Sequence, residues 1–252
     1  QLGNTNGVGS SIPVAVAGLA NVTAISLGDY HSCALLATGT AKCWGRNLLG
    51  QLGDTTTTNS NLPVAVQGLG AATALAAGGD HTCARLATGT AQCWGANWFG
   101  ALGDGTNTNR SFAVAVSGLG DVRSLAVGGD HSCAVLGDGT ARCWGSNIDG
   151  QLGTGSSSGP QLCAVSFRPT DTPCATSPVS VTGLADVTTM TAGVSHTCAL
   201  VADGTARCWG WNGPGMLGNG TTVGSSSPGT VSGWSAGTGV IALAAGANHT
   251  CT

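Results

Sequence analysis

Histidine is the side chain in this sequence whose chemistry is most readily used, because its ordinary pKa lies near neutrality. The pattern G-x-x-H-[ST]-C occurs five times, at His31, His81, His131, His196 and His249. Asp80 precedes His81 and Ser132 follows His131, so a general base beside a nucleophile can be drawn at these points. An active site is a single constellation, however, and this one recurs in every repeat. We therefore interpret the histidines as structural hydrogen-bonding groups and predict that the protein is not an enzyme.

A second candidate for chemistry is the run 104–109, which carries oxygen atoms at alternate positions, as calcium-binding loops do. Its carboxylate is that of Asp104, and the chain contains no glutamate that could follow as a bidentate ligand. We predict an ordinary turn here. No metal and no cofactor are expected.

The eleven cysteines carry the clearest signal. In each of the first four repeats a second cysteine follows the first by ten residues, across a glycine-containing turn, and C-x-x-C zinc spacing is absent. The predicted disulfides are Cys33–Cys43, Cys83–Cys93, Cys133–Cys143 and Cys198–Cys208, with Cys163–Cys174 in an inserted loop. Cys251 is left unpaired or intermolecular. Disulfides persist outside the reducing cytosol, so we predict a secreted, extracellular or cell-surface protein.

The residues between these motifs favour short strands. The chain has 43 glycines and many Thr, Val and Ala, an alphabet that suits strands and tight turns better than helices. Within one unit we expect strands at 64–66, 72–77, 81–87 and 90–95, with a hairpin turn at Gly89. Four strands would form one sheet of an all-β protein. A sheet of this size cannot bury both faces alone, so the copies should stack radially, as in a β-propeller.

The loop after each tryptophan makes the resemblance specific. The runs 44–53 and 144–153 read W-G-x-N-x-x-G-Q-L-G and resemble the repeats of the regulator of chromosome condensation (RCC1) family. The resemblance implies a seven-bladed propeller, and it does not fix an activity because the family serves several functions. We divide the single domain 1–252 into repeats at 1–50, 51–100, 101–150 and 151–215, the last with an inserted loop at 156–178, and a partial fifth at 216–252. The missing blades would come from a longer parent chain or from a neighbouring subunit by strand exchange.

The charge and the surface residues limit the classes of partner that this protein is expected to bind. The net charge is −3 and charged residues make up 8% of the chain, which disfavours nucleic acid, and no apolar run is long enough to span a membrane. Tryptophans that recur in phase with the repeat predict packing between blades, and they are Trp44, Trp94, Trp144 and Trp209. Aromatic residues out of phase with the repeat predict a contact surface, and they are Trp98, Phe99, Trp211 and Trp234. Possible N-glycosylation sites are Asn21, Asn109, Asn219 and Asn248.

These features lead to three functional hypotheses. The first is a non-catalytic extracellular scaffold that binds a protein partner or assembles with itself as a homo-oligomer. The alternative is a secreted inhibitor that presses one propeller face onto an enzyme. A guanine-nucleotide exchange factor comes third, because it would be expected inside the cell, where the cysteines would be reduced.

Overall fold

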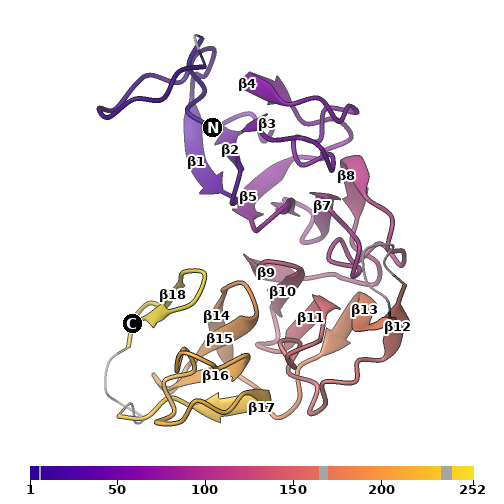
Figure 1. Ribbon diagram of the computed structural model, residues 1–252, viewed down its shortest axis with the longest axis vertical. Helices are drawn as coiled ribbons and strands as arrows, with labels where there is room; N and C mark the ends of the chain where they lie inside the picture. Colours follow the sequence, from indigo (N-terminus) through magenta and orange to yellow (C-terminus); the bar gives the residue numbers. More distant parts are fainter. Residues whose placement is uncertain (6, 165–169, 234–239) are drawn as a thin grey trace.

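The computed structural model describes residues 1–5, 7–164, 170–233 and 240–252. All regular elements within these ranges are β-strands, and they form five antiparallel sheets that follow one another around an open arc (Figure 1). The all-β prediction is confirmed. The described residues hold no helix long and apolar enough to cross a bilayer.

We call the sheets blades 1 to 4 and half-blade 5. Blade 1 consists of β1 (Val22–Leu27), β2 (His31–Leu36), β3 (Ala41–Gly45) and β4 (Ser60–Ala65). Blade 2 consists of β5 (Ala72–Ala77), β6 (His81–Leu86), β7 (Ala91–Gly95) and β8 (Arg110–Ala115). Blade 3 consists of β9 (Val122–Val127), β10 (His131–Leu136), β11 (Ala141–Ser146), β12 (Gln161–Cys163) and β13 (Thr172–Ser180). Blade 4 consists of β14 (Val187–Ala192), β15 (His196–Val201), β16 (Ala206–Gly210) and β17 (Ser225–Thr230), and half-blade 5 of β18 (Ala244–Ala245) and β19 (Thr250–Cys251).

The blade boundaries differ from the predicted repeat boundaries. The segment around Val64, expected to be the first strand of the second unit, belongs to β4 and closes blade 1, where Cys43 lies opposite Val64. The outermost strand of each blade therefore lies in the sequence that we had assigned to the following repeat. The sequence repeat has no natural starting point, so its period fixes the length of a unit without fixing where a blade begins.

The inserted segment is also more than the loop that we expected. Within it β12 pairs with the first part of β13, and β13 continues along β11, so blade 3 is a five-stranded sheet of order β12-β13-β11-β10-β9. Its alternation of short polar and apolar residues was too brief to separate a strand from a loop in the sequence. The insertion thus widens the outer edge of one blade.

The first strand of each blade lies on the inside of the arc, beside its counterparts. Strands β1, β5, β9, β14 and β18 contact one another in that order. Gly78, at the end of β5, shows how closely they approach, because a Cβ atom there would lie 2.0 Å from the carbonyl oxygen of Gly128. The first glycine of the G-x-x-H motif is therefore required by the contact between blades.

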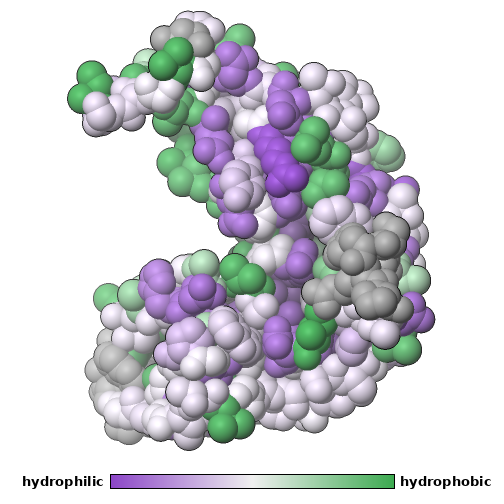
Figure 2. All heavy atoms as spheres, viewed as in Figure 1, coloured by the Kyte–Doolittle hydropathy of each residue, from purple (hydrophilic) through white to green (hydrophobic). Residues whose placement is uncertain are grey.

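The arc is open on one side, with β1 at one end and half-blade 5 at the other (Figures 1 and 2). The central strand β2 is almost wholly buried, whereas five of the six residues of β1 are exposed. The counterparts of β1 in the later blades are more buried, because a preceding blade covers them. Exposure along β1 is thus the consequence of its place at the end of the array.

Candidate interaction site

The histidines of the repeated motif connect one blade to the next. The Nε2 atom of each of the first four lies within hydrogen-bonding distance of a hydroxyl group in the following blade, and the pairs are His31 with Thr82 (2.7 Å), His81 with Ser132 (2.8 Å), His131 with Thr197 (2.8 Å) and His196 with Thr250 (2.9 Å). All four rings are buried. The partner is the hydroxyl residue of the same motif one repeat later, which a reading of adjacent residues could not find.

The hydrogen-bond network assigns the proton on His81. The Ser132 hydroxyl donates to the carbonyl oxygen of Ala101 at 2.9 Å, so the Nε2–H of His81 donates to the Ser132 oxygen. Burial, and to a smaller extent the neighbouring histidines, lowers the pKa of His81 and His131 to about 3. The pKa values of His31 and His196 fall to about 4, again through burial. The rings are neutral at physiological pH. His131 donates to Thr197 for the same reason as His81, since the Thr197 hydroxyl donates to the carbonyl oxygen of Gln151, and these contacts between blades support the structural interpretation.

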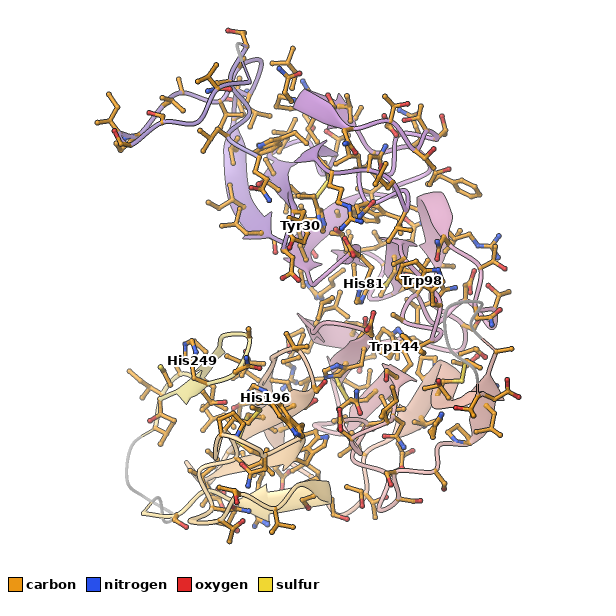
Figure 3. The ribbon with its side chains drawn as sticks, viewed as in Figure 1. Tyr30, His81, Trp98, Trp144, His196 and His249 are labelled. Carbon is orange, nitrogen blue, oxygen red and sulfur yellow. A yellow bond between two sulfur atoms is a disulfide. The ribbon has the colours of Figure 1, made fainter. Side chains whose placement is uncertain are left out.

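A buried tryptophan makes a second contact at each junction between complete blades. The indole Nε1–H of Trp94 donates to the carbonyl oxygen of Gln51 in the preceding repeat, at 2.9 Å. Trp144 and Trp209 donate in the same way to Ala101 and Gln151, also at 2.9 Å. Figure 3 shows Trp144 between blades 2 and 3. The in-phase tryptophans are therefore packing residues, as their spacing predicted.

Five disulfides join the pairs that the cysteine spacing predicted. Four of them link β2-type and β3-type strands of one blade across directly opposed residues, with Cα atoms 4.0 to 4.1 Å apart. The fifth joins Cys163 to Cys174, with Cα atoms 5.9 Å apart. Cys251 is free and exposed, at the open edge of half-blade 5.

The oxygen-rich run after Trp98 forms a closed turn. One carboxylate oxygen of Asp104 accepts hydrogen bonds from the Asn97 amide and from the backbone and hydroxyl of Thr106, and the other accepts from Arg110 Nε at 2.8 Å. Burial alone would raise the pKa of Asp104, but the hydrogen bonds from Thr106 and Arg110 outweigh it and lower the pKa below its usual value. Both carboxylate oxygens of Asp104 therefore already accept hydrogen bonds from donors within the protein. Across the described ranges, no three His, Cys or Asp side chains gather as a metal site requires.

The predicted contact surface needs correction. Phe99 is only 3% exposed and packs with Trp98 against the Cys163–Cys174 disulfide, so it anchors the insertion to blade 2 rather than facing a partner. The insertion that buries Phe99 could not be placed from the sequence. Trp211 is 41% exposed and remains available, and Trp234 lies outside the described residues.

The four sequons lie in different surroundings. Asn21 and Asn248 are exposed. Asn109 and Asn219 are half-buried, and their side-chain oxygens accept hydrogen bonds from Asn97 and Asn212 within the loops. Attachment of a glycan is therefore easiest at Asn21 and Asn248.

Two surface features were missed in the sequence. The first is a polar cluster on blades 1 and 2, in which the Arg46 guanidinium lies 5.4 Å from the centre of the Tyr30 ring and 3.8 Å from an Asp80 oxygen. The second is the apolar end face of blade 1, where Ile25 is 68% and Leu27 66% exposed. The repeat could have signalled the polar cluster, since Tyr30 replaces the aspartate found at positions 80 and 130.

Radially arranged sheets of four or five strands, joined at the junctions between complete blades by the same histidine and tryptophan contacts, define a β-propeller-type repeat protein. Two family models match, both for the regulator of chromosome condensation (RCC1) repeat, one at residues 22–51, 72–100, 122–151 and 187–215, and one at 1–35, 39–85, 89–135, 138–200 and 203–252. The chain belongs to the RCC1 repeat family. A comparison with curated protein sequences gave no match.

Solved structures with the same fold include the yeast RCC1 protein Prp20 bound to Kap60, with a TM-score of 0.76 and 20% identity, covering 91% of this chain and 53% of that one. Human WBSCR16 is similar with a TM-score of 0.74 and 26% identity, covering 91% and 56%. The ectodomain of the Physcomitrella patens receptor kinase CR4 has a TM-score of 0.52 and 21% identity, covering 94% and 48%. The chain thus spans about half the length of these structures.

Proposed function

We propose that the protein is a non-catalytic scaffold, secreted or displayed at the cell surface, that binds a protein partner or a second copy of itself. The observation that carries this proposal is that the polar side chains repeated in every blade are used to hold blades together. His81 and Ser132 are buried in one such junction. A catalytic group must instead reach a substrate. Interaction through variable surface residues on a rigid array is the use that remains for such a chain.

The disulfides support the extracellular part of the proposal. The eight cysteines of the blade disulfides are buried between sheets. Such bonds form during folding in an oxidising compartment and are rare in the cytosol. The fold by itself does not choose a function, since it also occurs in Prp20, whose binding to Gsp1p and histones has been studied.

The test asks whether the disulfides form when the protein is secreted, and whether the protein then assembles or binds a partner. The protein is expressed with and without a secretory signal, and intact mass under native and reducing conditions gives the number of disulfides. Light scattering after size exclusion, electron microscopy and affinity capture from extracellular fluid then report self-assembly and partners. We expect five disulfides in the secreted form and either a partner or an oligomer. A reduced protein that is monomeric, forms no filaments and captures nothing would contradict the proposal.

Trp211 supports the second candidate, a secreted inhibitor of an enzyme. Its exposed ring stands where blades 1 to 3 carry Arg46, Ala96 and Ser146. Large aromatic side chains often dominate the energy of protein interfaces. Under this alternative W211A abolishes inhibition, whereas F112A, which removes another exposed aromatic ring on β8, leaves it unchanged. Equal inhibition by both variants would rule out the Trp211 surface.

A further inference from the structure

The loop that follows each in-phase tryptophan carries an apolar group at one repeated place, directly after the buried asparagine of W-G-x-N. The residue there is Leu48 in blade 1, Trp98 in blade 2 and Ile148 in blade 3. In blade 4 it is Gly213, and the ring of Trp211 takes the place of its side chain, because a Cβ atom on this glycine would lie 2.6 Å from the indole. We call these four apolar side chains, one from each complete blade, the apolar row.

The apolar row is exposed over junctions at which both blades are present. Leu48 is 57% exposed, although its loop reaches blade 2, where a Cβ atom on Gly50 would lie 2.7 Å from the Ser111 Cα atom. Ile148 is 37% exposed over the junction of blades 3 and 4. Trp98, on the outer side of blade 2 in Figure 3, is half-buried because it packs beside the inserted segment. One exposed aliphatic residue is ordinary, but repeated exposure at one position is a feature that packing within the fold does not require.

Buried amide side chains hold these loops in one shape. In blade 1 the side-chain oxygen of Asn47 accepts the Leu52 N–H at 2.9 Å. The Gln51 amide oxygen accepts the Leu49 N–H at 2.8 Å, and the amide nitrogen donates to Asp80 of blade 2 at 2.7 Å. The apolar side chain between Asn47 and Leu49 is therefore presented by backbone that is already ordered, which reduces the entropy lost when a partner binds.

The end of the blades that carries the apolar row is acidic. Its segments are the turns between first and second strands and the loops that follow the third strands, taken as far as position 160 in blade 3. The carboxylates in these described segments are those of Asp29, Asp54, Asp80, Asp104, Asp130 and Asp149. Arg46 is the one cationic residue within the same segments, and Arg110, at the start of β8, is paired with Asp104 at 2.8 Å. Asp29 and Asp130 are exposed, so this surface presents negative charge beside apolar groups.

We propose that the apolar row and the neighbouring carboxylates form a docking surface for a cationic polypeptide segment in which bulky apolar residues stand between lysines or arginines. The proposal rests on the proposed function and names one surface and one class of partner for it. Apolar side chains of the segment would cover the row and remove its area from water. The carboxylates select a positive partner, because like charges brought together across an interface oppose binding. An anionic membrane, or the same face of a second copy, would meet that repulsion.

The test measures the binding of fluorescein-labelled synthetic peptides to the whole chain by fluorescence anisotropy. One peptide alternates lysine with leucine, a second alternates lysine with serine, and a third alternates glutamate with leucine. We expect the lysine–leucine peptide to bind roughly tenfold more tightly than either of the others, because it alone matches both the apolar row and the carboxylates. Its affinity should fall as salt is added, since salt screens exposed charges. Equal binding of either comparison peptide would overturn the proposal.

Protein variants locate the surface. Replacing Leu48 and Ile148 together by serine should weaken binding of the lysine–leucine peptide roughly tenfold, because both apolar contacts are lost. The matched control is L62S, which changes an exposed leucine of β4 outside these loops and should leave the affinity unchanged. D130N should weaken binding about threefold, whereas D138N removes the same charge from the hairpin turn at the other end of β10 and should have no effect.

Thermal unfolding checks that each variant is folded. If the variant with serine at both positions binds the lysine–leucine peptide as tightly as the unmodified protein does, the apolar row is not the site and the proposal fails. Sedimentation with phosphatidylcholine vesicles that requires Leu48 and Ile148 would assign the row to a lipid surface and would equally overturn it. A negative peptide result leaves the scaffold function standing, because that function fails only if the secreted protein shows neither a partner nor an assembly.

Discussion

Replacing Ser132 by alanine tests whether the histidine contacts hold the array together. Ser132 is fully buried, accepts the His81 Nε2–H and donates to the Ala101 carbonyl. Trp144 also donates to that carbonyl, so the carbonyl keeps a partner after the change, but the His81 N–H does not. A buried orphan donor costs about 1–3 kcal/mol and the lost hydroxyl bond about 1 kcal/mol more. We expect S132A to lower the free energy of unfolding by about 2–4 kcal/mol.

Urea unfolding followed by circular dichroism measures this loss. The matched control is S132T, which keeps the hydroxyl group and places the residue found at positions 82 and 197. It should stay within about 1 kcal/mol of the unmodified protein, a change of the size expected for one added methyl group. A double-mutant cycle with H81A should show a coupling energy, since the two groups are in contact. If S132A unfolds at the same urea concentration as the unmodified protein, the histidine contacts contribute nothing and the reasoning fails.

Three further outcomes are expected. The pKa of His131 is lowered to about 3 in the folded protein, by burial and then by His196, and is about 6.5 in the unfolded chain. The unfolded chain therefore binds protons first as the pH falls, so the free energy of unfolding should be constant above about pH 7 and should drop by roughly 2 kcal/mol for this residue at pH 5. Urea midpoints that do not change with pH would contradict this. Replacing Cys33 and Cys43 together by alanine should cost about 2–3 kcal/mol by loss of the crosslink, measured by calorimetry, whereas an unchanged melting temperature would show that the bond is dispensable. The melting temperature should be the same in millimolar calcium and in chelator. D104A should lower the free energy of unfolding by about 1–3 kcal/mol, because the donors that bind the Asp104 carboxylate lose their acceptor. If calcium raised the melting temperature of the unmodified protein and not that of D104A, the metal-site alternative would be restored.

Much of the fold could be predicted because it is local and repeated. Cys83 and Cys93 flank a tight turn at Gly89, and a two-strand hairpin of that length leaves them opposite one another whatever surrounds it. The regular spacing of the tryptophans likewise predicted a packing role for Trp144, because a residue that occupies the same position in every repeat meets the same neighbouring position in every repeat.

The candidate site was harder to predict, because exposure depends on neighbours in space. Phe99 resembles a surface aromatic residue in the sequence, and only the folded insertion buries it against Cys163 and Cys174. The exposure of Ile25 and Leu27 follows from the place of blade 1 at the end of the arc, since the same positions in later blades are covered. No local pattern carries that information.

The sequence by itself determined the class of structure, the period, the hairpins and their disulfides, because each of these depends on residues within one unit. Tertiary structure alone decided which strand closes which blade and which hydroxyl group each of the first four motif histidines meets. Those features arise where two blades touch, between residues about 50 positions apart, such as His81 and Ser132. Contacts at that separation are set by how the sheets stack.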